Sequence, residues 1–176
     1  MFMKKMSARM LTVAGATALA LGAVTGTQAA SPQTANLSVT ATVSANCTIA
    51  TTAVAFGQYD PVVAQASADL PATGKVSVTC TTGAPATITL GQGVDPDPSS
   101  TDAAPVRRMK AGTDYLSYNL YSENTHTDVW GNDATSDVEN TGTGANQDIT
   151  VYGLVPAGQN VPTGNYADTV VATITF

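Results

Sequence analysis

Basic residues are scarce in this chain of 176 residues. It contains 7 Lys and Arg against 13 Asp and Glu, and a single histidine. Charged residues make up 11% of the sequence and aromatic residues 6%. A protein with so few cations is a poor partner for nucleic acid or for an anionic membrane surface. The composition therefore argues against both kinds of binding.

Residues that could act as catalytic bases or metal ligands are also few. The only histidine, His126, lies in the loop-like stretch ENTHTD, and no Gly-x-Ser-x-Gly motif is present. We therefore expect no catalytic residues and no enzyme. The acidic stretch DPDPSSTD, with Asp95, Asp97 and Asp102, lacks the glycine and the terminal glutamate of a calcium loop. It predicts a solvated acidic loop, with no metal and no cofactor.

Long apolar runs are missing, with one exception near the N-terminus. Lys4, Lys5 and Arg9 precede the stretch MLTVAGATALALGAV, which is short for a membrane span, and small residues follow in GTQAAS. This pattern is typical of a secretory signal peptide, and we expect residues 1–29 to be cleaved after Ala29. The remaining chain would carry a formal charge of −9, from 4 basic and 13 acidic residues. It would be exported by this signal, without insertion into a membrane.

Beyond the signal the composition favours strands and turns, because Thr, Ala, Val, Gly and Asp dominate and Leu, Lys and Glu are few. Short runs with a period of two alternate with turn signals. They predict strands over residues 34–43, 52–56, 75–80, 86–90, 114–123, 127–131, 148–156 and 166–176. Polar loops are expected at 91–105 and 136–147. This spacing, without a repeat or a linker, predicts one all-β antiparallel sandwich.

The first of these runs is an amphipathic strand. Leu37, Val39, Ala41 and Val43 fall on alternate positions, with Asn36, Ser38, Thr40 and Thr42 between them. If the body from residue 47 to residue 176 supplies six main strands, it is one short of the usual seven-stranded sandwich. Such a body would have an open groove and unpaired strand edges, which proteins normally avoid. A detachable amphipathic strand would fill that groove.

Two cysteines, Cys47 and Cys80, follow the predicted signal peptide. In an oxidising compartment a single disulfide between them is the expected state. Closing a loop of this length stabilises the fold by roughly 3–4 kcal/mol in the chain-entropy view. We interpret the pair as a structural cross-link at the junction between the first strand and the body.

Four segments of the sequence resemble the spore coat protein U domain family. These are VSANCTI (43–49), VSVTCTTGAP (76–85), LSYNLYSENTHTDVWG (116–131) and PTGNYADTVVATITF (162–176). The resemblance covers essentially the whole chain after the signal. Its more specific elements are Tyr-Asn-Leu-Tyr followed by Trp-Gly, and Gly-Asn-Tyr-x-Asp.

The family includes subunits of archaic, Csu-type chaperone–usher pili. The resemblance implies an incomplete immunoglobulin-like sandwich, held by a periplasmic chaperone that lends a strand and then polymerised head to tail at an outer-membrane usher. It implies a surface fibre for adhesion and biofilm formation. Residues 30–45 would be the donor segment and residues 46–176 the sandwich domain. The implied donor residues are Ala35, Leu37, Val39, Ala41 and Val43, and the implied acceptor groove includes Val170, Ala172, Ile174 and Phe176 of the final strand.

Other functions stay open at this level. The protein could be a monomeric secreted or coat-associated sandwich in which residues 34–43 pair in cis. Carbohydrate binding would need exposed aromatic residues, whereas Trp130 and the tyrosines at 115, 118, 121 and 152 lie within predicted strands, which favours packing. A tip adhesin would carry a second domain and no donor segment, so a rod or adaptor subunit is favoured. The basic cluster of Arg107, Arg108 and Lys110 is expected to flank a hairpin and balance acids, or to contact a neighbouring subunit.

Replacing Cys47 by Ser is expected to lower the yield of exported protein, because the unfolded chain loses its cross-link. Periplasmic yield and the thermal unfolding midpoint measure the effect. Unchanged yield and stability would remove the disulfide from this account.

Overall fold

The computed structural model describes residues 31–176, so the predicted signal peptide lies outside the described residues. The chain divides into residues 1–40 and a compact body, residues 41–176. All the strands described belong to the body: β1 (Cys47–Thr52), β2 (Leu70–Cys80), β3 (Pro85–Leu90), β4 (Arg107–Ala111), β5 (Asp114–Tyr121), β6 (Val138–Thr141), β7 (Asn146–Val155) and β8 (Ala172–Thr175). One 3-10 turn, Ala64–Ala66, precedes β2.

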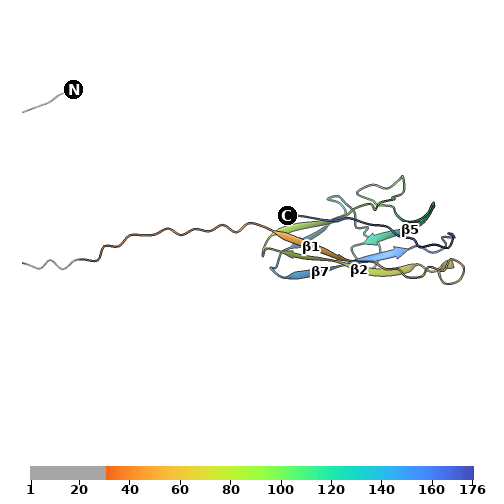
Figure 1. Cartoon of the computed structure of the whole chain (residues 1–176), viewed down its shortest axis with the longest axis horizontal. Coiled ribbons are helices and arrows are strands. Elements are labelled where there is room, and N and C mark those ends of the chain that lie inside the picture. The colour runs from red at the N-terminus through yellow and green to blue at the C-terminus, as the bar shows by residue number, and fades with distance from the viewer. Residues whose placement is uncertain (1–30) are drawn as a thin grey trace, which may run out of the picture. The chain divides into compact units, whose positions relative to one another are not determined.

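The body is an all-β antiparallel sandwich, as the sequence predicts. One sheet has the strand order β1-β2-β7-β5-β4 and the other β6-β3-β8, and every pairing is antiparallel. Figure 1 shows β1, β2 and β7 side by side in the larger sheet. Alternate side chains from the two sheets share one core, which includes Val76, Val78, Ile88, Leu120 and Val151.

Several strand boundaries differ from those expected. The strand predicted at 52–56 is wrong: the paired strand is β1, in register with β2 from Cys47–Cys80 to Thr52–Lys75, and the chain then leaves the sheet. β6 lies in the loop expected at 136–147, and β4 lies in a segment for which no strand was predicted. The body therefore has eight strands, and the count of six is wrong. Residues 127–131 form only a single bridge, between Tyr121 and Val129.

The basic cluster flanks the β4–β5 hairpin, as expected, but Arg107 is fully buried and lies outside the ion pairs of the described residues. Its guanidinium donates to the carbonyl oxygens of Leu90 (2.9 Å), Gly91 (2.9 Å) and Trp130 (2.7 Å), and to Oδ1 of Asn119 (3.1 Å). Burial lowers the pKa of Arg107 to about 10, so the side chain is still charged at neutral pH. Because it reaches from β4 to the end of β3, this residue joins the two sheets.

The other two members of the basic cluster do balance acids. Arg108 lies 3.3 Å from a carboxylate oxygen of Asp97, and Lys110 lies 2.9 Å from one of Asp95. The acidic loop is therefore paired with β4 instead of being only solvated. Trp130 is fully buried and donates from Nε1 to the Ile88 carbonyl at 2.9 Å, so it packs in the core, as its predicted strand position favours.

A disulfide joins Cys47 to Cys80 across the β1–β2 pair. The pairing continues one residue further, since Thr81 donates its backbone N–H to the Asn46 carbonyl at 2.9 Å. The Asn46 N–H in turn donates to the Thr81 hydroxyl at 3.1 Å. Residues 46 and 47 are thus held against the end of β2 by one covalent and two hydrogen bonds.

Residues 31–176 contain neither a membrane-spanning helix nor a metal-binding cluster of side chains. No helix in this range is long and apolar enough to cross a bilayer. Groups of three or more His, Cys, Asp or Glu placed to hold a metal ion are also absent from this range.

Replacing Arg107 by Ala is expected to lower the free energy of unfolding by on the order of 3 kcal/mol or more, because several buried carbonyls lose their donor. Lys75→Ala, which removes an exposed pair with Asp148, should cost less than about 1 kcal/mol. Urea denaturation of both variants measures the difference. Equal losses would show that the buried guanidinium does not hold the sheets together.

Candidate functional site: an open apolar groove

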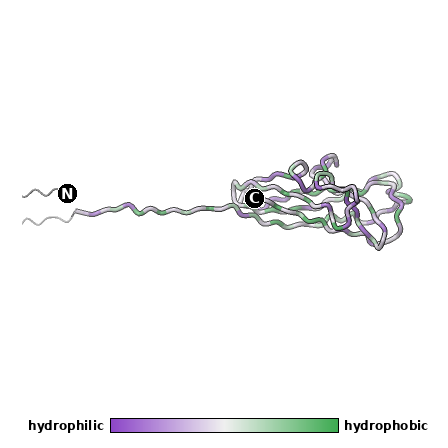
Figure 2. The backbone as a smooth tube through the Cα atoms, turned by 90° about the horizontal axis from the view of Figure 1, so that it is seen from above, coloured by the Kyte–Doolittle hydropathy of each residue, from purple (hydrophilic) through white to green (hydrophobic). Residues whose placement is uncertain are grey.

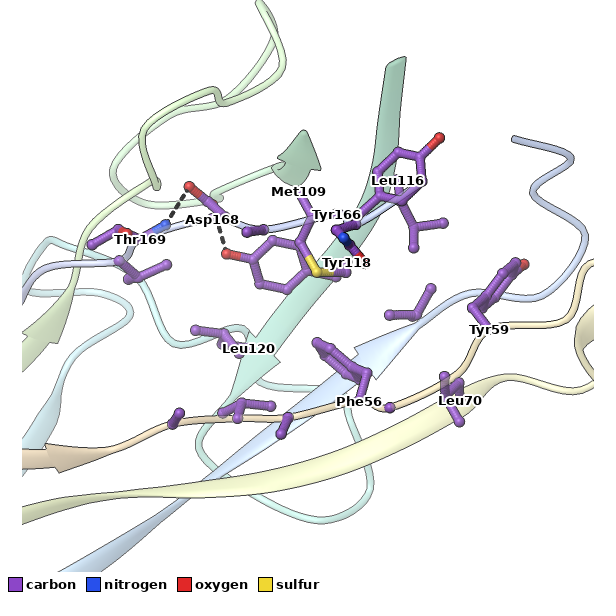
Figure 3. A pocket seen from close by; sticks show the side chains of 18 of the residues that line it. Phe56, Tyr59, Leu70, Met109, Leu116, Tyr118, Leu120, Tyr166, Asp168 and Thr169 are labelled. Carbon is purple, nitrogen blue, oxygen red and sulfur yellow. Dashed lines mark hydrogen bonds between the residues drawn. The ribbon is translucent and has the colours of Figure 1, made fainter. Parts of the chain in front are cut away.

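A cavity of about 870 Å³ opens along one side of the sandwich. Residues 53–59, the first rim, and residues 161–170, the second rim, both line it, together with Thr51 and Thr52 at the end of β1. Its floor is apolar and comes mainly from both sheets; it includes Leu70, Val76, Leu90, Leu116, Tyr118, Leu120, Val151 and Val155. Figure 3 shows Phe56 and Tyr59 on one side of this space and Tyr166 and Asp168 on the other.

The first rim is an extended segment that lies over the sheet without pairing to it. Val54 and Phe56 are half-buried and pack against the core, whereas Ala53, Ala55 and Gly57 are exposed. Two glycines allow this close approach. A Cβ atom on Gly74 would lie 2.6 Å from the Thr52 carbonyl oxygen, and one on Gly153 would lie 2.7 Å from a Val54 methyl group and 2.8 Å from the Phe56 ring.

The second rim also has a period of two. Tyr166, Asp168 and Val170 are half-buried, and the residues between them are exposed. The rim is attached to both sheets, since Ala167 and Lys110 exchange backbone hydrogen bonds of 3.2 and 2.9 Å and Gly91 donates to the Val171 carbonyl at 2.9 Å. It is therefore fixed in place although only Ala172–Thr175 count as a strand.

The backbone of the first rim lacks partners. Among the described residues, no backbone–backbone hydrogen bond involves residues 53–59. Free N–H and C=O groups along an extended segment are a template for pairing with another strand. The groove therefore offers both main-chain hydrogen bonds and an apolar floor, which are the two requirements for binding an added β-strand.

The wall of the groove carries one carboxylate, Asp168, in a defined hydrogen-bond network. The Tyr118 hydroxyl donates to one oxygen at 2.7 Å, and the backbone N–H of Thr169 donates to the other at 2.7 Å (Figure 3). The backbone N–H of Val94 donates to this second oxygen at 2.8 Å. Burial, with the nearby carboxylate, raises the pKa of Tyr118, so its phenol remains a neutral donor. Asp168 therefore joins β5, the loop at residue 94 and the second rim.

Chemically, the groove can bind an extended apolar segment. Among the described lining residues, only Lys75 and Asp168 are charged. The rings of Phe56 and Tyr118 make an edge-to-face contact, with 5.9 Å between their centroids, and form part of the apolar surface. His126 does not line the groove and packs against the ring of Tyr121, 5.1 Å between centroids. The described lining thus contains no histidine to act as a base beside a nucleophile.

The segment named as donor is extended, without strand pairing, and its large apolar side chains are in solvent. Leu37 is 87% exposed, Val39 84% and Val43 83%, and Ala35 and Ala41 are exposed as well. Figure 2 shows the alternation of hydrophobic and hydrophilic residues along this segment. Regularly spaced aliphatic residues so exposed to water are unusual for a soluble surface and are typical of interaction sites.

The four residues named for the acceptor side lie in different positions. Val170 and Ala172 line the groove. Ile174 packs against the core, and Phe176 is 54% exposed and outside the groove lining. Sequence reasoning did not assign Phe56, Tyr59, Tyr166 or Asp168 to the groove, although the last two belong to the Gly-Asn-Tyr-x-Asp element.

The fold and groove define a class of all-β sandwich with an open apolar groove on one side. The sequence matches the Spore Coat Protein U domain over residues 33–173, and the chain belongs to this family, which confirms the resemblance seen in its motifs. It is 48% identical to Protein U of Myxococcus xanthus over 179 residues, an alignment that covers 97% of this chain and 100% of that protein.

A solved structure shares the fold. It is the CsuC–CsuE chaperone–tip adhesion subunit pre-assembly complex from archaic chaperone–usher Csu pili of Acinetobacter baumannii, with a TM-score of 0.54 and 24% sequence identity. The match covers 77% of this chain and 40% of that chain, so the present protein spans less than half of its structural neighbour.

Replacing Gly153 by Ala is expected to destabilise the body by about 1–3 kcal/mol, because the added methyl group overlaps Val54 and Phe56 of the first rim. Gly91→Ala is the control, since the nearest atom to its added Cβ would be 3.5 Å away. Urea unfolding of both variants gives the comparison. If Gly153→Ala is as stable as the control, the first rim does not rest on β7.

Proposed function

We propose that this protein is a structural, non-enzymatic subunit of a chaperone–usher pilus and polymerises by donor-strand exchange. One observation carries the proposal: a single chain contains both an exposed amphipathic segment and an open groove with an unpaired rim. The segment of one copy fills the groove of the next. The groove takes the place of an active site as the functional centre of the molecule.

The lengths of donor and groove agree. Residues 35–43 and the lining stretch 51–59, which adds the last two residues of the edge strand β1 to the first rim, each contain nine residues. At about 3.3 Å per residue, each extends roughly 30 Å. A donated strand of this length can pair along the whole rim while its alternate side chains enter the groove.

The energetic contribution of the donor side chains is substantial. Burying Leu37, Val39 and Val43 contributes about 1.5–3 kcal/mol each, and Ala41 contributes less. Each new main-chain hydrogen bond adds about 0.5–1.5 kcal/mol. Ordering of the segment opposes these terms. A slip of one residue would place Ser38, Thr40 and Thr42 in the apolar groove, so the register is well specified.

The contact is heterologous, because donor and acceptor are different surfaces of one chain, and such contacts propagate into open filaments. Before assembly, a periplasmic chaperone covers the groove with a strand of its own, and an outer-membrane usher exchanges it for the next donor. Support for a chaperone comes from the structural neighbour, which was crystallised in a chaperone–subunit pre-assembly complex. The product is a fibre on the cell surface that serves adhesion and biofilm formation.

A monomeric, coat-associated sandwich is the competing function. There the segment at residues 34–43 pairs with the groove of its own chain. The two functions predict different oligomeric states, and an unboiled denaturing gel distinguishes them. Strand exchange gives a ladder of multimers that collapses to monomer on heating. Pairing in cis gives a single monomer band.

Replacing both Leu37 and Val39 by Asp is expected to abolish polymerisation, because two carboxylates would have to enter an apolar groove. The body should still fold with its chaperone. The matched control replaces Ser38 and Thr40 by Asp, which adds the same charge on the opposite face of the donor.

Electron microscopy and the unboiled gel measure the outcome. We expect fibres and a ladder for the wild type and the control, and neither for Leu37→Asp/Val39→Asp. Normal fibres from that variant would reject the donor assignment.

A further inference from the structure

We propose that consecutive copies in the fibre make a second contact outside the groove, in which Val62 and Val63 of the accepting copy pack against Phe176 of the donating copy. This inference rests on the proposed strand exchange and adds an interaction surface to it. The partner is a second copy of this chain.

The two patches lie at opposite ends of the body. Strand β2 runs from Leu70, paired with Val155, to Cys80, paired with Cys47. We call the end with Cys47 and Cys80 the base and the end with the loop 60–69 the far end. Both Figures 1 and 2 place the C-terminus near the end where β1 begins, which is the base.

The far end presents two neighbouring valines on a well-ordered loop. Val62 is 79% exposed and Val63 75%. Their backbone N–H groups donate to one carboxylate oxygen of Asp60 at 3.0 and 3.1 Å, and Gln65 donates its N–H to the Asp60 carbonyl at 2.8 Å. The adjacent Pro61 lines the groove, so this patch is continuous with the strand-binding surface.

The base presents one large apolar side chain. Phe176 is 54% exposed and follows β8, whose Thr175 is paired with Thr87. The base is also where the donor segment joins the body, because Asn46 is held by Thr81 next to the disulfide. A donor strand therefore carries Phe176 of its own copy toward the acceptor that it fills.

The linker between donor and body is short. Only residues 44–46 separate Val43 from Cys47, and three residues extend at most roughly 11 Å. The Thr81 hydroxyl also lies 3.5 Å from the Ser44 carbonyl oxygen, which shortens the free length further. When Val43 occupies a groove, the donating body must lie directly against one end of the accepting body.

That end must be the far end if the fibre is to grow. Entry with Val43 at the base would bring two bases together, where the acceptor's own donor segment leaves at Asn46. Entry with Val43 near Tyr59 leaves the acceptor's base free and places the donor's base beside Val62 and Val63. The two exposed apolar patches then meet in every subunit junction.

The test is a chemical cross-link in assembled fibres of the full chain. Val62→Cys is combined with Phe176→Cys, and the fibres are treated with a short bis-maleimide and boiled in detergent. The control pair is Asn146→Cys with Phe176→Cys, because Asn146 is exposed and pairs with Thr79 near the base, at the opposite end of β2 from the loop 60–69. We expect a ladder that survives boiling only for the first pair.

The outcomes separate this contact from strand exchange itself. An unboiled ladder that collapses to monomer on boiling, despite the reagent, would overturn the end-to-end contact and leave strand exchange intact. Equal cross-linking in the control pair would overturn it as well. Absence of any unboiled ladder in the unmodified protein would reject strand exchange, and the contact with it.

Discussion

The first rim is an extended stretch of backbone that lies over an apolar floor without a hydrogen-bonding partner. Residues 53–59 leave the sheet after Thr52, yet Val54 and Phe56 stay packed on Gly74 and Gly153. This arrangement keeps the groove open and its main-chain groups available at the same time. The proposed strand exchange, the proposed chaperone and the proposed direction of fibre growth all depend on this unpaired rim.

The rest of the body stabilises the sandwich without closing the groove. Arg107 joins β4 to the end of β3, and Asp168 joins the second rim to Tyr118 of β5. The disulfide between Cys47 and Cys80 fixes the point at which the donor segment meets the body. Because these interactions lie outside the first rim, the two sheets hold together while one side stays vacant.

The all-β class, the disulfide and the amphipathic pattern of residues 35–43 follow from local patterns, because a period of two and a cysteine pair are visible in the sequence. The number and bounds of the eight strands could not be predicted from these patterns. β4 contains Arg107, Arg108 and Lys110, and three charged residues in five do not show the pattern of a buried strand. The strand forms because the Arg107 guanidinium is buried and donates to three carbonyl oxygens. The first rim looked like a strand at 52–56 because sequence alternation does not report hydrogen-bond partners. Only the packing of the two sheets shows which alternating segment is left unpaired.

Hydrogen–deuterium exchange of the full chain, monomeric and assembled, tests the unpaired rim most directly. The account predicts fast exchange for the amides of residues 35–43 and 53–59 in the dilute monomer, and slow exchange of both sets in the polymer. Both changes should occur together, because each segment supplies the other's partners across two copies. Slow exchange of residues 35–43 in the dilute monomer would contradict the account, since the segment would already occupy the groove of its own chain.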